Sequence, residues 1–118
     1  MAREFEAGDD LIFQLESGFG LLRVLAIDGE GNDTVWHLRA YDEFFPDVES
    51  AEKALAQPTP MPVRLSHMAL TNRAFERTPA ARLGNRPVAE EELSGYKTWL
   101  ASDGHVSDRS ALLMLGIR

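Results

Sequence analysis

The 118-residue chain contains no cysteine, and this absence removes several kinds of chemistry at once. Thiol nucleophiles, disulfide frameworks and zinc sites with thiolate ligands all require cysteine. Long apolar runs are also missing, because the stretches 20–22 and 24–27 are separated by Arg23. Both are far shorter than the roughly 20 residues of a membrane-spanning helix. The first residues are acidic where a secretory signal would be basic, so we expect a cytoplasmic protein that does not span a membrane.

Positive charge is scarce as well. Twelve lysines and arginines stand against nineteen acidic residues, which gives a net charge of −7. This sign argues against a nucleic-acid-binding protein, because affinity for nucleic acid depends on cations that neutralise phosphates. The 44% hydrophobic and 26% charged residues are typical of globular proteins. A chain of this length predicts a single domain over 1–118 with a core of its own.

The charges are distributed unevenly. Residues 1–60 carry thirteen acids and four bases, a balance of −9, whereas residues 61–88 carry five arginines and one glutamate, a balance of +4. The planar guanidinium group suits carboxylate and phosphate. These arginines therefore either pair with the acid-rich first half of the chain or bind an external anion. The candidate anion-binding residues are Arg73, Arg77, Arg82 and Arg86.

Three apolar segments separated by glycine-rich turns predict an antiparallel meander, with strands at 10–15, 21–27 and 34–41. A fourth strand is predicted at 63–70, where Leu65 and His67 would share one face by alternation.

Two helices complete the prediction. Asp47 is a good N-cap for a helix at 48–57, and three consecutive glutamates suit the first turn of a helix at 87–102. The segment 71–88 reads as irregular, and the tail 107–116 fits a short helix or a last strand. The sequence thus predicts an α+β domain: a strongly curled antiparallel sheet, made of a three-stranded meander plus a fourth strand, with two helices packed on it.

Catalytic and metal-binding patterns are weak. The three histidines, His37, His67 and His105, have no spacing typical of metal ligands. Ser66 and His67 are adjacent, which places their side chains on opposite faces of a strand. The turn 28–33 begins like a calcium loop but lacks the required glycine and the final glutamate. We therefore predict no enzymatic activity, no metal and no cofactor, with a hydrolase using His37 or His67 as a remaining alternative.

Aromatic and acidic residues occur together between 36 and 47. Trp36 and at least one of Phe44 and Phe45 are expected in the core. The remaining side chains predict an exposed patch, because protein-binding surfaces combine aromatic anchors with charged rims. The predicted partner-binding residues are Tyr41, Asp42, Glu43 and Asp47.

Residues 5–13 and 17–25 read in order as Gly-Asp, an apolar strand, Gly-aromatic-Gly and a second apolar strand. This pattern, over about a third of the chain, resembles the start of small-barrel immunity proteins from bacterial polymorphic-toxin systems. The resemblance implies an inhibitor that plugs a toxin, and an acidic surface would complement a basic toxin.

The sequence as a whole predicts a non-enzymatic protein-binding domain that acts through an acidic surface on a basic protein partner. The alternative is a module for a small ligand or a nucleic acid that uses the arginine-rich segment 64–86. These two readings differ in which charged residues carry the binding.

Overall fold

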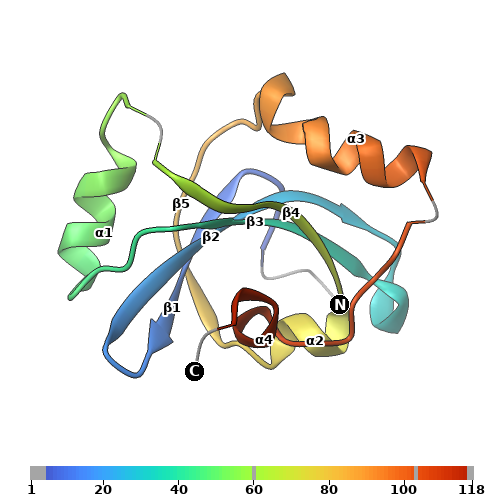
Figure 1. Ribbon diagram of the computed structural model, residues 1–118, viewed down its shortest axis with the longest axis horizontal. Coiled ribbons are helices and arrows are strands. Elements are labelled where there is room, and N and C mark those ends of the chain that lie inside the picture. The colour runs from blue at the N-terminus through green and yellow to red at the C-terminus, as the bar shows by residue number, and fades with distance from the viewer. Residues whose placement is uncertain (1–4, 60, 103, 117–118) are drawn as a thin grey trace.

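The computed structural model describes residues 5–59, 61–102 and 104–116. Five strands form one antiparallel sheet in the order β4-β3-β2-β1-β5 (Figure 1). The strands are β1 (Asp9–Leu15), β2 (Gly18–Asp28), β3 (Val35–Tyr41), β4 (Val63–Thr71) and β5 (Ala80–Asn85). Because β4 and β5 are the two edges, the sheet is open. The prediction of an α+β fold with a curled antiparallel sheet is confirmed.

Strand β5 lies inside the segment that the sequence predicted to be irregular. It pairs with β1 from Asp9 opposite Asn85 to Phe13 opposite Ala80. The strand is short and carries few large apolar side chains, so it has no clear period of its own. Pairing with β1, rather than local propensity, therefore makes it a strand.

The first predicted helix is present as α1 (Val48–Leu55). The side chain of Asp47 accepts a hydrogen bond from the backbone N–H of Ser50 at 2.7 Å, as expected for an N-cap. The second predicted helix is divided into a 3₁₀ turn, η2 (Glu90–Leu93), and a shorter helix, α3 (Ser94–Ala101). Pro87 precedes both elements and does not lie in a first helical turn.

Two further short helices appear. Helix α2 (Asn72–Glu76) follows β4 directly and was not predicted. In the tail, α4 (Ala111–Leu115) takes the helical alternative, and Ser110 caps it. Upstream of this cap, Ser107 forms an isolated parallel bridge with Leu70 of β4.

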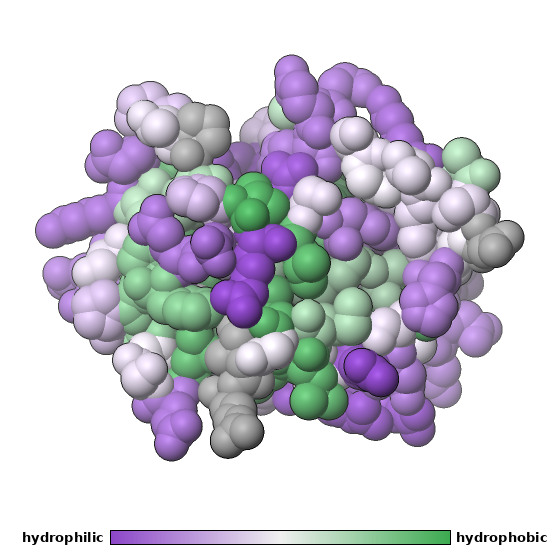
Figure 2. All heavy atoms as spheres, viewed as in Figure 1, coloured by the Kyte–Doolittle hydropathy of each residue, from purple (hydrophilic) through white to green (hydrophobic). Residues whose placement is uncertain are grey.

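Apolar side chains are buried on both faces of the sheet. The larger core lies within the curl, where α2 and α4 pack against it: Phe5, Leu11, Phe13, Leu15, Leu22, Val24, Trp36, Leu38, Ala40, Met68, Leu70, Ala74, Phe75, Ala111 and Leu115. The smaller core lies under α1: Ile12, Leu21, Tyr41, Phe45 and Ala51. Figure 1 shows α2 and α4 on one side of the sheet and α3 on the other. In Figure 2, apolar side chains gather in the middle of the visible face and hydrophilic ones form most of its rim.

A β-bulge interrupts the alternation of side chains between the two faces of the sheet. The pairing of β3 with β4 shifts between Leu38 and Ala40. As a result, Leu65 packs against the larger core, whereas His67 lies against Gly95 of α3. The prediction that Leu65 and His67 share a face is therefore wrong, because the bulge interrupts the alternation.

None of the described helices combines the length and the apolar character that a membrane crossing requires.

Candidate functional site

Four of the five arginines of segment 61–88 form ion pairs within the chain. The pairs are Arg64–Asp42, Arg73–Asp108, Arg82–Asp9 and Arg86–Asp10. The fifth arginine, Arg77, donates a hydrogen bond to the backbone carbonyl of Asp108 at 2.9 Å. These contacts attach β5 to β1 and residue 108 to the region of α2. The charge of the segment is thus largely balanced inside the molecule.

One buried arginine organises the centre of this charge network. Arg23 of β2 is 1% exposed. Its guanidinium group donates to Asp10 at 3.3 Å and to both carboxylate oxygens of Glu92, from Nε at 2.5 Å and from Nη2 at 3.1 Å. It also donates to three backbone carbonyl oxygens, those of residues 8, 86 and 87. Burial would raise the pKa of Glu92, but hydrogen bonds from Arg23 and from the Ala89 N–H hold that pKa below its ordinary value. From the sequence, Arg23 was recognised only as a polar residue between two apolar stretches, and its role in the network was not predicted.

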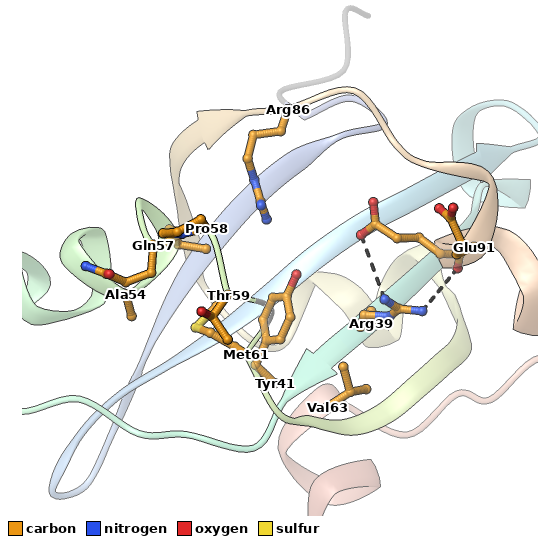
Figure 3. A pocket seen from close by; sticks show the side chains of 12 residues that line it. Arg39, Tyr41, Ala54, Gln57, Pro58, Thr59, Met61, Val63, Arg86 and Glu91 are labelled. Atoms are coloured by element: carbon orange, nitrogen blue, oxygen red, sulfur yellow. Dashed lines mark hydrogen bonds and ion pairs between the residues drawn. The ribbon is translucent and has the colours of Figure 1, made fainter.

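A pocket of about 430 Å³ lies beside this network (Figure 3). It is enclosed by β3, β4, the end of α1 with the connector that follows, and η2. The lining residues are Arg39, Tyr41, Ala54, Leu55, Gln57, Pro58, Thr59, Met61, Val63, Arg86, Glu91 and Glu92. The volume falls within the range of small-molecule sites, roughly 300 to 1,000 Å³. Only Tyr41 and Arg86 among these residues were candidates from the sequence, because the pocket is assembled from segments far apart in the chain.

Tyr41 and Arg86, which the sequence assigned to two different sites, both line this pocket. Tyr41 is 7% exposed, so the prediction that it belongs to an exposed patch is wrong. Its ring packs in the smaller core, while its hydroxyl end projects into the pocket (Figure 3). Burial raises the pKa of Tyr41, and the nearby Asp10 raises it further, although Arg23 and Arg86 oppose the shift.

The other predicted partner-binding residues lie outside the pocket on a surface that we call the acidic face. It consists of the exposed acids Asp42, Glu43, Asp47, Glu49 and Glu52, with Phe44 and Val48 among them. Phe44 is 44% exposed and Val48 is 38% exposed, so two large apolar side chains stand among these acids; Val63, Leu100 and Leu113 are exposed elsewhere on the described surface.

The backbone explains why Phe44 points outward. Phe45 and Phe19 exchange two hydrogen bonds of 2.8 Å each, so the chain is extended at this point. Phe45 is buried in the smaller core, and its neighbour Phe44 must face the other way. On α1, Ala51 is fully buried, which leaves the opposite side of the helix to solvent.

The carboxylates of the acidic face have few cationic partners. Asp42 lies 3.6 Å from Arg64, and both side chains are more than a third exposed. Asp47 is occupied as the cap of α1, and its hydrogen bonds from Ser50 lower its pKa. Glu43, Glu49 and Glu52 form no ion pair with any other described residue.

Two of the histidines meet under α3. His37 is fully buried, and its Nε2 lies 2.8 Å from Asp28, while its Nδ1 lies 3.0 Å from Nε2 of His67. From α3, the hydroxyl of Tyr96 donates to Asp28 at 3.0 Å, and Trp99 packs edge-on against His37.

This arrangement places a histidine next to a carboxylate, as the hydrolase alternative requires. However, α3 lies over the pair, and neither His37 nor His67 lines either of the two described pockets. Burial lowers the pKa of both histidines; for His67 the pKa falls to about 4, with the charge of His37 adding to the effect. His105 is exposed. Among the residues that the structure describes, no group of three or more acidic or histidine side chains could hold a metal ion.

Comparison of the chain with protein-family models, with curated proteins and with solved structures finds no significant match.

Proposed function

We propose that this chain is a non-enzymatic binding domain whose acidic face holds a basic protein partner. The observation that carries the proposal is the division of the charges. The arginines of segment 61–88 pair mainly with carboxylates elsewhere, including Asp9, Asp10 and Asp108. Glu43, Glu49 and Glu52 keep uncompensated negative charge in the described structure, so this charge is available to a partner.

The apolar residues of the acidic face support the same proposal. Phe44 and Val48 provide contact area that would be desolvated in a complex, and the surrounding carboxylates would form the charged rim. Such a rim speeds the encounter with a positively charged partner and disfavours acidic ones. The specific form that we propose is an immunity-type inhibitor that meets a basic toxin in the cytoplasm.

Charge reversal on the acidic face tests the proposal. Immobilised protein is used to capture partners from a bacterial lysate at low salt, and the captured protein is then titrated by calorimetry. We expect a basic protein that binds the unmodified chain, is released as salt rises, and is lost with Glu43→Lys plus Glu49→Lys. Asp47 is left unchanged, because its carboxylate caps α1.

The matched control reverses two exposed acids of the turn between β2 and β3, Glu30→Lys plus Asp33→Lys, and should retain the partner. Equal loss in this control would show that only net charge matters and would contradict a specific surface. If Arg73→Glu plus Arg77→Glu abolishes capture while the acidic-face variant does not, the arginine segment is the binding site and the proposal is wrong.

A further inference from the structure

The pocket beside the acidic face has a balanced set of charges. Its lining contains two arginines, Arg39 and Arg86, and two glutamates, Glu91 and Glu92. A purely anionic ligand would meet the glutamates, and a purely cationic ligand would meet the arginines. A ligand that carries one charge of each sign can pair with both the arginines and the glutamates, which a ligand with a single charge cannot do.

Both arginines have N–H groups left for a ligand. Arg39 uses Nε and Nη2 on the backbone carbonyls of Ser66 and Glu92, both at 3.3 Å, whereas its Nη1 is 3.8 Å from the nearest carboxylate, beyond hydrogen-bond distance. Arg86 uses Nε and Nη2 on Asp10, at 2.8 and 3.0 Å, and a further N–H on the hydroxyl of Tyr41, which leaves two N–H groups. A guanidinium group has five N–H donors, so each arginine can still donate to a carboxylate.

The two glutamates of the pocket differ in how far they are already engaged. Glu92 is engaged by Arg23 and by the Ala89 N–H. Glu91 is exposed and forms no ion pair with another described residue, so its carboxylate can accept from an ammonium group. In Figure 3, Glu91 and Arg39 lie on the same side of the pocket, which suits two opposite charges that are close together in one ligand.

The opposite wall is apolar. It comes from the end of α1, the proline-rich connector and the start of β4, and its main members are Leu55, Pro58, Met61 and Val63. Pro58 and Pro62 restrict the backbone on the two described sides of the connector.

We propose that this pocket binds a free α-amino acid with an apolar side chain, a site separate from the acidic face. The carboxylate of the amino acid would accept hydrogen bonds from Arg39 and Arg86. The ammonium group would donate to Glu91, and the side chain would lie against Leu55 and Met61. Pairing of both charged ends with protein groups compensates for the water that each loses on binding.

Calorimetry with three matched ligands tests this site. The ligands are L-leucine, isopentylamine, which lacks the carboxylate, and isocaproate, which lacks the ammonium group. We expect leucine to bind and each analogue to bind at least about tenfold more weakly, equivalent to about 1.4 kcal/mol. If either analogue binds as well as leucine, or if leucine shows no binding up to about 10 mM, the proposal is overturned.

Two variants assign the charged contacts. Glu91→Gln should weaken leucine binding and remove the preference for leucine over isocaproate. Arg39→Gln should weaken leucine binding and remove the preference for leucine over isopentylamine. Glu91 is exposed, so its variant tests the site even if Arg39→Gln is poorly folded. Glu16→Gln and the acidic-face variant Glu43→Lys plus Glu49→Lys should bind leucine normally, and equal weakening in these controls would contradict the assignment.

Discussion

Nδ1 of His37 and Nε2 of His67 lie 3.0 Å apart, across the neighbouring strands β3 and β4. Asp28 accepts from Nε2 of His37, so in a neutral His37 the Nδ1 atom has no hydrogen and accepts from His67. The two imidazoles therefore share one hydrogen. If both rings were fully protonated, two N–H groups would face each other, and this contact would be lost.

Stability should depend on pH because of this pair. The pKa of His67 is about 4 in the folded protein, below its ordinary 6.5, so the unfolded chain takes up a proton first as the pH falls. The free energy of unfolding should therefore be independent of these groups well above pH 6.5 and should decrease as the pH falls from 6.5 towards 4. Urea denaturation at a series of pH values measures this decrease. His67→Gln should flatten it, whereas the exposed control His105→Gln should not; equal slopes in all three proteins would contradict the assignment.

Removing the buried guanidinium group should be costly. Arg23→Met is expected to lower the free energy of unfolding by about 3 to 5 kcal/mol, because it removes the cation that faces the carboxylates of Asp10 and Glu92 and the donor to three carbonyl groups. The measurement is urea denaturation of both proteins, with the slope checked for constancy. Arg73→Met is the control, since the Arg73–Asp108 pair lies on the surface. A loss as small as that of the control would show that the buried network does not stabilise the fold.

The contact between α3 and β4 leaves no space at Gly95. A Cβ atom placed there would lie 2.7 Å from Cβ of His67. Gly95→Ala should therefore destabilise the protein by about 1 to 3 kcal/mol, although alanine favours helix formation. Displacement of α3 should also change the fluorescence of Trp99. Gly84→Ala serves as the control, because nothing lies within 4 Å of the added atom; an unchanged or increased stability of Gly95→Ala would show that α3 is not held against β4.

Substitutions of two phenylalanines should have different effects, one on stability and the other on partner binding. Phe75 is 6% exposed and stacks on Trp36 with 4.1 Å between ring centroids. Phe75→Ala should cost about 3 to 5 kcal/mol in thermal or urea unfolding. Phe44→Ala on the acidic face should change stability by less than about 0.5 kcal/mol and should weaken capture of the basic partner. If Phe44→Ala is strongly destabilising or leaves capture unchanged, Phe44 does not have the role proposed for it.

The parts of the fold that local patterns determine were predicted from the sequence. The first four strands and the start of α1 at Asp47 depend on apolar periodicity and on a cap, which are properties of neighbouring residues. Strand β5 could not be found in this way, because its partner β1 lies more than sixty residues away in the chain. The bulge that turns Leu65 inward depends likewise on the pairing of two strands.

The candidate site shows the same division. Asp42, Glu43 and Asp47 were expected at the surface and are exposed, whereas Glu49 and Glu52 were not among the predicted residues. Tyr41 was misplaced because alternation cannot tell which side of a sheet a helix will cover. Arg39, Glu91 and Glu92 come from separate segments, and only tertiary structure brings them together around one pocket. Single residues of this kind carry no local signal.

The pairing of β1 with β5 also has a consequence for the order in which the chain folds during synthesis. Asp9 and Asp10 leave the ribosome early, whereas Arg82 and Arg86 follow more than seventy residues later. Until then, Asp9 and Asp10 lack their ion pairs with these two arginines, and one edge of β1 is unpaired. A nascent chain that ends before residue 80 should therefore remain sensitive to proteases, and protection should appear only once β5 has emerged.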